Sequence, residues 1–168
     1  PAQFLDEYKS IERNAQIITL KDVGAIIAST GINKDSKVLD AGTGSGALAC
    51  YLAKICKEVV SVDVEKENTE TGKRNAKKLG IKNIEFLTED ITRFKGKDFD
   101  VFCLDIPEPW TAYKTANIVL NKGGFLITYT PQIEQAMKTV RQAPKELLLR
   151  EIKEVDEQQW AIDDKRSK

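Results

Sequence analysis

A protein of 168 residues without a single histidine must do its chemistry with other groups. Ser-His-Asp and Cys-His nucleophiles are excluded, as is any histidine-ligated metal site. The cysteines Cys50, Cys56 and Cys103 are odd in number and widely spaced, which fits neither a disulfide framework nor a zinc site. We therefore expect no metal, a reducing cytoplasmic compartment, and chemistry based on carboxylates, lysines, tyrosines, backbone dipoles or a bound cofactor.

One carboxylate stands at the end of an apolar run, in the stretch Phe102-Cys-Leu-Asp-Ile-Pro-Glu-Pro-Trp110. Proline rings fix the backbone φ angle, so Pro107 and Pro109 stiffen the residues that follow Asp105 and keep its carboxylate in place. The sequence thus predicts a positioned acid, whose partner depends on the elements around it.

A glycine turn stands beside a second acid, in the stretch Val38-Leu-Asp-Ala-Gly-Thr-Gly-Ser-Gly-Ala-Leu48. The stretch has the pattern of a strand, a turn and a helix. Gly42, Gly44 and Gly46 allow the backbone to turn tightly and to approach a ligand closely. The amino end of the following helix points at the same place. We predict a ligand site at this turn.

Two cofactors fit the glycines, and Asp40 helps to choose between them. Gly42, Gly44 and Ala47 match the dinucleotide pattern G-x-G-x-x-A, which is weak by itself. Asp40, two residues before the first glycine, is poorly placed beside a negatively charged pyrophosphate. It is well placed near the amino group of a ligand such as S-adenosylmethionine. The glycine turn also contains no basic residue to meet a phosphate.

Two further acids follow later strands. Asp63 closes the second predicted strand, where a carboxylate can accept two ribose hydroxyl hydrogen bonds from either cofactor. Asp90, in Thr88-Glu-Asp-Ile91, follows the third strand and can accept from an adenine amino group. Each acid alone also fits an ordinary helix cap or turn. Together, at successive strand ends beside the glycine turn, they favour S-adenosylmethionine.

The elements that must position these acids alternate between strands and helices. Helical spacing predicts helices at 47–56, 66–79, 111–120 and 132–142. Runs rich in β-branched residues predict strands at 37–40, 58–63, 83–87, 99–105 and 124–129. This alternation predicts an α/β fold with a Rossmann-like, doubly wound parallel sheet, whose ligands bind beyond the carboxyl ends of the strands.

Further segments flank this core. Two helices, Phe4–Arg13 and Lys21–Thr30, are predicted within an N-terminal helical segment of residues 1–34, ahead of one domain of residues 35–168. Glu146–Val155 is predicted to form one more strand, and Asp163–Lys168 is a polar end. No run approaches the roughly 18 apolar residues that cross a bilayer, so we expect no membrane association.

Over about residues 35 to 130 the chain resembles the class I S-adenosylmethionine-dependent methyltransferases. Amino-methyltransferases of this class often carry an Asp/Asn-Pro-Pro-aromatic motif after the fourth strand. The version Asp105-Ile-Pro-Glu-Pro-Trp110 looks like that of the tRNA (adenine-N1)-methyltransferases. Ala15-Gln-Ile-Ile-Thr-Leu-Lys-Asp22 is similar to that family's Gln-Ile-Ile-Tyr-Pro-Lys-Asp segment, and Gly44-Ser-Gly-Ala-Leu48 also agrees.

The resemblance implies transfer of a methyl group from S-adenosylmethionine to N1 of a T-loop adenine in tRNA. Adenine N1 has its own lone pair, so the attack needs no base. The resemblance implies that Asp105 is the catalytic residue, which holds the exocyclic amine and stabilises the developing positive charge. It places Pro107 and Trp110 at the substrate. The implied cofactor-binding residues are Gln16, Asp40, Gly42, Gly44, Ser45, Gly46, Ala47, Leu48, Asp63, Asp90 and Ile91.

The chain departs from the family pattern in three places. Thr19 stands where the family commonly has an aromatic or ring residue. Family members carry a small β-rich domain before the methyltransferase core, whereas a short helix precedes it here. They also end in a further strand that completes an antiparallel pair at the sheet edge. We therefore expect the sheet to lack its last edge strand, in a chain truncated at both ends.

Several alternatives stay open. Methyltransferases of corrinoid (precorrin) biosynthesis have a helix similar to Lys21–Ile27, but usually a glycine-rich turn after the fourth strand. A non-catalytic partner subunit would be expected to lose the glycine turn or Asp105, and both are intact. A nicotinamide dehydrogenase lacks a convincing proton-transfer group here. Family resemblance also implies a homotetramer.

Overall fold

The computed structural model describes residues 3–13 and 16–160, so Ala15 and the polar end after 160 lie outside the described residues. The strands are β1 (Lys37–Ala41), β2 (Glu58–Asp63), β3 (Ile84–Thr88), β4 (Phe99–Leu104) and β5 (Leu120–Thr128). The α-helices are α1 (Phe4–Lys9), α2 (Leu20–Thr30), α3 (Ala47–Ala53), α4 (Lys66–Lys78), α5 (Tyr113–Val119) and α6 (Ile133–Arg141). Two 3-10 turns, η1 (Ile91–Arg93) and η2 (Pro109–Ala112), follow β3 and β4.

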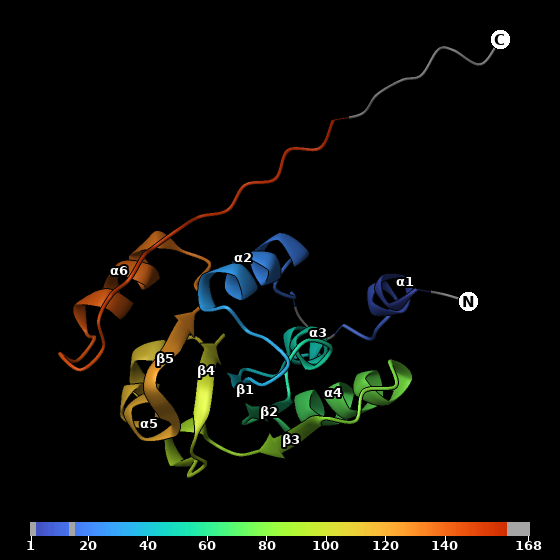
Figure 1. The fold of residues 1–168 in the computed structure, drawn as a ribbon, viewed down its shortest axis with the longest axis horizontal. Helices are drawn as coiled ribbons and strands as arrows, with labels where there is room; N and C mark the ends of the chain where they lie inside the picture. Colours follow the sequence, from blue (N-terminus) through green and yellow to red (C-terminus); the bar gives the residue numbers. More distant parts are fainter. Residues whose placement is uncertain (1–2, 14–15, 161–168) are drawn as a thin grey trace.

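The five strands form one sheet in the order β3-β2-β1-β4-β5, and all four pairs are parallel (Figure 1). Helices α3, α4 and α5 connect β1 to β2, β2 to β3 and β4 to β5, because parallel neighbours cannot be joined by a tight hairpin. The chain proceeds outward from β1 to β3 and then returns to β4 on the other side of β1. The doubly wound α/β fold is confirmed. Within the described residues no strand lies beyond β5, as predicted.

Helices cover both faces of the sheet. On one face, residues of α1, α2, α3 and α4 pack against β1, β2 and β4 in a single apolar cluster that includes Tyr8, Val23 and Leu52. On the other face, α5 and both 3-10 turns cover Leu39, Phe102 and their neighbours. Residues of the N-terminal 34 positions therefore share a core with the sheet.

Two predicted boundaries differ from the structure for identifiable reasons. Helix α1 ends at Lys9 rather than Arg13, because the backbone N–H of Glu12 donates to the Asn75 side chain of α4 (2.9 Å) instead of continuing the helix. Strand β5 begins at Leu120 rather than Gly124, because Leu120 pairs with Phe99 across a register shift.

The predicted strand Glu146–Val155 is wrong. The described residues after α6 contain no strand, and Leu148 is 93% exposed. Instead of pairing with β5, this segment runs back along α6 and then past α2 (Figure 1), and its contacts with α2 and β5 are made by side chains. Lys153 donates to Ser29 Oγ (2.8 Å), and the Arg150 guanidinium lies 5.2 Å from the Phe125 ring centre. Alternating apolar residues favour a strand only where a neighbouring backbone satisfies the N–H and C=O groups.

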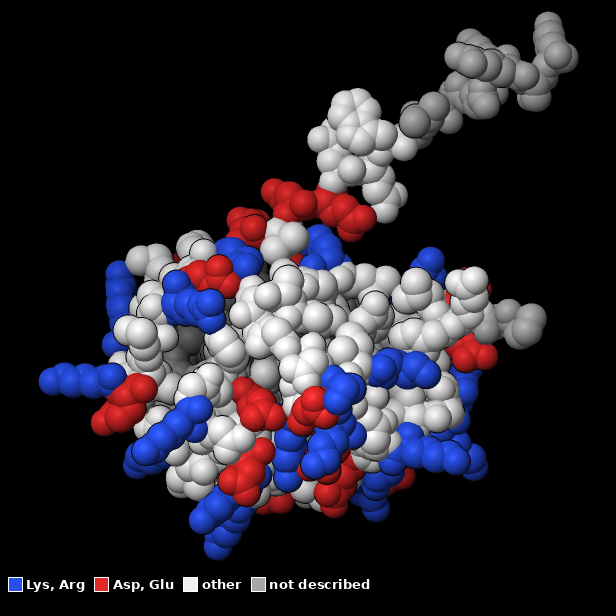
Figure 2. Space-filling view, in the orientation of Figure 1, with Lys and Arg blue, Asp and Glu red and all other residues white. Residues whose placement is uncertain are grey.

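Charged side chains of both signs are interspersed over the face seen in Figure 2, and no single basic field dominates it. Within residues 3–13 and 16–160, no helix is long and apolar enough to cross a membrane.

Candidate active site

The glycine turn and the motif acid meet at the carboxyl ends of β1 and β4, the two neighbouring strands at which the strand order reverses. Ligands of open α/β sheets bind at this switch point. The Asp105 backbone N–H donates to the Ala41 carbonyl (2.8 Å), which continues the β4–β1 ladder by one step. The two predicted motifs, far apart in the sequence, are therefore held side by side.

Gly42 makes this approach possible. Its φ is +93°, and a Cβ at this position would lie 2.0 Å from the Asp105 carbonyl oxygen. Only glycine has both the conformation and the space, because any other side chain would overlap the backbone of the motif acid. The turn that follows, with φ of +51° at Gly44 and +73° at Gly46, leads directly into α3.

Asp40 is the most buried acid of the site, at 1% exposure. Ser61, directly opposite in β2, donates to Asp40 Oδ2 (2.6 Å), and Thr43 shares a hydrogen bond with Ser61 (2.7 Å). Burial raises the pKa of Asp40 to about 7; the Ser61 hydrogen bond opposes this shift, and the neighbouring Asp105 and Asp63 add to it. Asp40 Oδ1 has no hydrogen-bond partner among the described residues.

A buried oxygen without a partner costs free energy, so a ligand group that donates a hydrogen bond to it would be stabilised there. The Ser45 hydroxyl, in the glycine turn and also buried, is unpartnered as well among the described residues. Around Gly44, in contrast, a Cβ would meet nothing within 4 Å. The Asp40 carboxylate can accept a hydrogen bond from an amino group, and the Ser45 hydroxyl can donate or accept one, so these residues fit S-adenosylmethionine.

Asp63 fixes the other side of the turn. Its carboxylate accepts from the backbone N–H of Gly44 (3.1 Å), the backbone N–H of Glu65 (2.9 Å) and the Asn68 side chain (3.1 Å). The acid at the end of β2 is therefore tied to the glycine turn itself. Its predicted role toward ribose hydroxyls stays a prediction.

Asp90 caps the 3-10 turn η1. Its Oδ1 accepts from both the backbone N–H and the hydroxyl of Thr92, and these bonds lower the pKa of Asp90. Ile91 is buried beneath it, and its carbonyl accepts from Thr115 (3.1 Å). The contact of Asp90 and Ile91 with adenine stays a prediction, as does that of the buried Ala47 and Leu48 at the start of α3.

Asp105 is half-buried at the end of β4, and this burial raises its pKa to about 6. The carboxyl group is therefore mainly ionised at neutral pH, although it is less solvated than a surface acid. An ionised carboxylate can only accept hydrogen bonds, which suits an amine ligand.

The residues after Asp105 are tied to α6. Gln135 donates to the Pro107 carbonyl (2.8 Å), and the Lys138 ammonium lies 4.0 Å from the Trp110 ring centre. The Tyr113 hydroxyl donates to the Thr139 carbonyl. Pro107 is exposed and Trp110 half-buried, and their contact with an acceptor stays a prediction.

Sequence reasoning missed several residues of this site. Ser61 and Thr43 complete the Asp40 hydrogen bonds, and only the strand register brings them there. Tyr129, one residue beyond β5, lies beside Asp105 because its N–H donates to the Leu104 carbonyl (2.9 Å). Its hydroxyl donates to Asp22 (3.4 Å), which also accepts from Thr19. The aromatic residue one step past a strand end was the available signal.

Gln16 is exposed in the segment ahead of α2, and Ile18 two residues later is buried in the core. Thr19, where the family commonly has a ring, is the N-cap of α2. The predicted contact of Gln16 with the cofactor stays a prediction.

The sheet order, the glycine turn and the acids at its rim define the fold of the class I S-adenosylmethionine-dependent methyltransferases. Residues 9–168 match the family model described as the tRNA methyltransferase complex GCD14 subunit, and the chain belongs to this family. Fold and family imply S-adenosylmethionine as the methyl donor.

Individual relatives agree. The chain is 34% identical, over 87% of its length and 62% of the relative's, to the tRNA (adenine(57)-N(1)/adenine(58)-N(1))-methyltransferase TrmI of Methanocaldococcus jannaschii. It is 29% identical, over 94% of its length and 65% of the relative's, to a tRNA (adenine(58)-N(1))-methyltransferase TrmI of Thermus thermophilus. The crystal structure of tRNA (m1A58) methyltransferase TrmI from Aquifex aeolicus superposes with a TM-score of 0.79 at 28% identity, covering 84% of this chain and 59% of that one. The chain thus spans about three fifths of these relatives' length.

Proposed function

We propose that this chain carries the methyl-transferring domain of an enzyme that methylates N1 of an adenine in tRNA, with S-adenosylmethionine as donor. The observation that carries the proposal is the backbone contact between Gly42 and Asp105. It sets the proposed cofactor turn and the proposed acceptor acid side by side, and both lie within the residues that the family model covers.

On the cofactor side, Asp40 and Ser45 have buried oxygens that find no partner within residues 3–13 and 16–160, and a Cβ at Gly44 would have free space around it there. S-adenosylmethionine, when bound, supplies an electrophilic methyl group on a sulfonium. Asp40 would accept from its amino group, and Asp63 from ribose hydroxyls. Asp90 and Ile91 would border the adenine, with Gln16, Gly42, Gly46, Ala47 and Leu48 completing the cofactor residues.

On the acceptor side, Asp105 would accept a hydrogen bond from the exocyclic amine of the target adenine. This contact orients the ring and keeps N1 free to attack. As the methyl group is transferred, positive charge spreads over N1 and the amine, and the adjacent carboxylate stabilises it. No general base is needed, which suits a chain without histidine. Pro107 and Trp110 would border the acceptor pocket.

The proposal includes partners. The names of the relatives point to tRNA, and family resemblance to a homotetramer. Three free cysteines, all buried, fit a reducing cytoplasm. The corrinoid alternative is not favoured, because the family model covering residues 9–168 is one of tRNA methyltransferases. The intact glycine turn and Asp105 argue against a non-catalytic subunit.

The first experiment is calorimetric titration with S-adenosylmethionine, followed by methyl transfer to unmodified tRNA. Asp105→Asn should bind the cofactor within twofold of wild type and lose about a hundredfold or more in kcat. Asp40→Asn should lose cofactor binding. Asp35→Asn, an exposed acid beside Lys34 ahead of β1, is the matched control and should change neither value.

The outcomes separate the two halves of the proposal. Cofactor binding with methyl transfer to N1 that depends on Asp105 supports it. Binding without transfer to any tRNA, in the complete protein, would refute the acceptor and leave the cofactor. Absence of binding to the wild-type protein would refute the whole proposal.

A further inference from the structure

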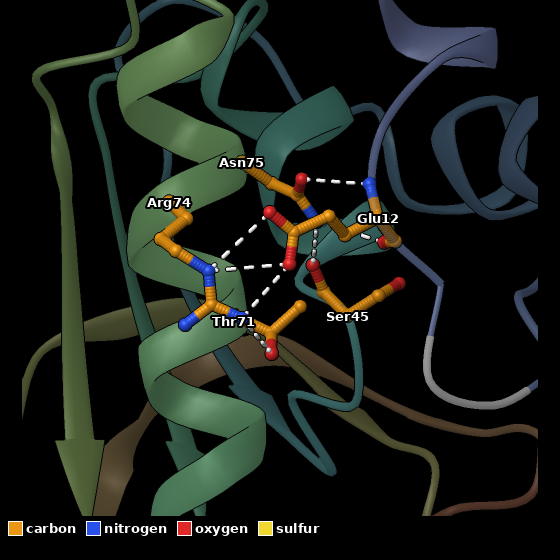
Figure 3. A network of polar contacts seen from close by, with 5 residues as sticks. All are labelled: Glu12, Ser45, Thr71, Arg74 and Asn75. Atoms are coloured by element: carbon orange, nitrogen blue, oxygen red, sulfur yellow. Dashed lines mark hydrogen bonds and ion pairs between the residues drawn. The ribbon is translucent and has the colours of Figure 1, made fainter.

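Asn75 of α4 is buried to 1% exposure although it stands in a helix rich in charged residues. Its amide oxygen and both hydrogens of its amide nitrogen form hydrogen bonds (Figure 3). Oδ1 accepts from the Glu12 backbone N–H (2.9 Å), and Nδ2 donates to the Glu12 carbonyl (2.9 Å) and to the Ser45 carbonyl (2.8 Å). One side chain thus joins three elements: α4, the segment after α1, and the glycine turn.

The hydrogen bond to Ser45 holds the middle residue of the glycine turn. Ser45 lies between Gly44 and Gly46, whose φ angles of +51° and +73° are left-handed. A turn with this backbone has few internal restraints, because glycine restricts φ and ψ less than any other residue. The Asn75 amide is a fixed donor at the middle residue, whose hydroxyl is one of the unpartnered buried groups.

The two bonds to Glu12 hold its backbone, four positions before Gln16 in the sequence. They involve the backbone of residue 12 and not its side chain. The Glu12 carboxylate instead forms an exposed ion pair with Arg74 (2.8 Å), which also donates to Thr71 (Figure 3). The structure therefore offers a natural separation between a buried amide clamp and a surface ion pair at the same residue.

We propose that Asn75 is a positioning residue for the cofactor site, which holds the Ser45 turn and the backbone of Glu12 in a fixed relative position. The inference rests on the proposed function, since it concerns the affinity for S-adenosylmethionine. A turn released from this position samples more conformations, and only a fraction of them bind, so the apparent affinity falls by that fraction.

The test compares three variants by calorimetry, at a temperature well below each unfolding midpoint. Asn75→Ala removes all three bonds, and Asn75→Asp keeps the size of the side chain but lacks its two donor hydrogens. Both should raise the Kd for S-adenosylmethionine about tenfold. In methyl transfer the KM for the cofactor should rise similarly, while kcat at saturating cofactor and the KM for tRNA change less than twofold. Glu12→Ala removes only the ion pair and should leave the Kd within twofold.

A second measurement on the wild-type protein needs no substitution. Saturation with the cofactor should slow hydrogen exchange of the Glu12 amide several-fold, because that amide is held by the same side chain as the turn. The Lys37 amide, which donates to Asp100 Oδ2 (2.9 Å) at the opposite end of the sheet, is the control and should not change.

Three results would overturn the inference. Folded Asn75 variants with a lower unfolding midpoint and an unchanged Kd would show a purely structural role. Cofactor-independent exchange at Glu12 would show that turn and segment are not coupled, even if no Asn75 variant folds. A wild-type protein that does not bind S-adenosylmethionine would refute both the inference and the proposed function. If the wild type binds, the Asn75 variants test the inference alone.

Discussion

The two halves of the site are built differently. On the cofactor side, hydrogen bonds of Asp40, Asp63 and Asn75 join β1, β2 and α4 to one another and to the glycine turn. On the acceptor side, the residues after Asp105 are held by α6, through the hydrogen bonds of Gln135 and Tyr113 and the contact between a lysine and an aromatic ring. The first half is buried and the second is partly exposed.

This difference indicates which elements position the residues of each half. In the proposed site, a cofactor common to a whole class of enzymes would be bound by backbone groups and buried acids. The acceptor, which distinguishes one enzyme from the next, would be bound by a short loop that a peripheral helix holds. Substitutions in the first half should therefore strongly lower stability or cofactor affinity. Substitutions in the second half should lower activity toward the acceptor by smaller amounts.

The largest effect is expected where the halves touch. Gly42→Ala would place a Cβ 2.0 Å from the Asp105 carbonyl oxygen, at a φ of +93°. Strain and overlap together should lower the free energy of unfolding by about 4 kcal/mol. Gly44→Ala, at a φ of +51° with no atom within 4 Å of the added Cβ, should lower it by only about 1 kcal/mol. Urea unfolding of both variants measures the contrast, and equal losses would contradict the close contact.

The next effect concerns the burial of Asp40, whose pKa is raised from 3.8 to about 7. The folded protein then holds a proton that the unfolded chain releases. Its contribution to stability is full below pH 4 and is lost as the pH rises to about 7. The cofactor-free protein should lose roughly 4 kcal/mol of unfolding free energy over this range, at about 1.4 kcal/mol for each unit of the pKa difference.

Asp40→Asn removes this titration, so the slope of unfolding free energy against pH should become markedly flatter. Asp105, with a pKa of about 6, adds a smaller loss in the same direction, and the variant should retain it. Urea titrations at several pH values test this. A wild-type slope that survives the substitution would mean that Asp40 is less buried than the structure has it.

A moderate effect is expected on the acceptor side. Lys138→Met removes the ammonium 4.0 Å from the Trp110 ring centre, a contact worth about 0.5–1 kcal/mol. We expect kcat/KM for tRNA to fall a few-fold and the Kd for the cofactor to stay unchanged. Lys114→Met, an exposed lysine on the neighbouring α5, is the control. A change in cofactor affinity would break the separation between the halves.

The smallest effect is expected at Tyr129. Its hydroxyl reaches Asp22 at 3.4 Å, a long hydrogen bond, so Tyr129→Phe should lower the free energy of unfolding by only a few tenths of a kcal/mol. Thr19→Val removes the shorter bond to the same carboxylate (2.8 Å) and should cost about 1 kcal/mol. Thermal unfolding compares the two variants. A larger loss for Tyr129→Phe would show that Tyr129, and not Thr19, is the main hydrogen-bond donor to Asp22.

Much of the cofactor half could be predicted from the sequence, because its signals are local. The strand, glycine turn and helix around Gly42 have their own residue pattern, and Asp40 and Asp63 are placed by strand ends. The partners of Asp40 could not be predicted. Ser61 reaches it only through the register between β1 and β2, which depends on the whole sheet.

The C-terminal part was predicted less well. The alternating apolar residues of Glu146–Val155 suggested a strand, but alternation cannot supply the neighbouring strand that pairing requires. Nor does the sequence indicate that Gln135 and Lys138 of α6 hold the loop after Asp105. Asn75 was overlooked for a related reason, since its burial depends on a segment more than sixty residues earlier in the chain.

The contact between Gly42 and the Asp105 carbonyl has a practical consequence for redesign. An engineer who wishes to change the acceptor by grafting a different loop after β4 must also match the path of its first peptide group to this glycine. A graft whose carbonyl is displaced by an ångström would shift either the donor turn or the new acceptor, and such shifts are enough to slow a transfer reaction severely. Donor turn and acceptor loop are best exchanged together, as one cassette.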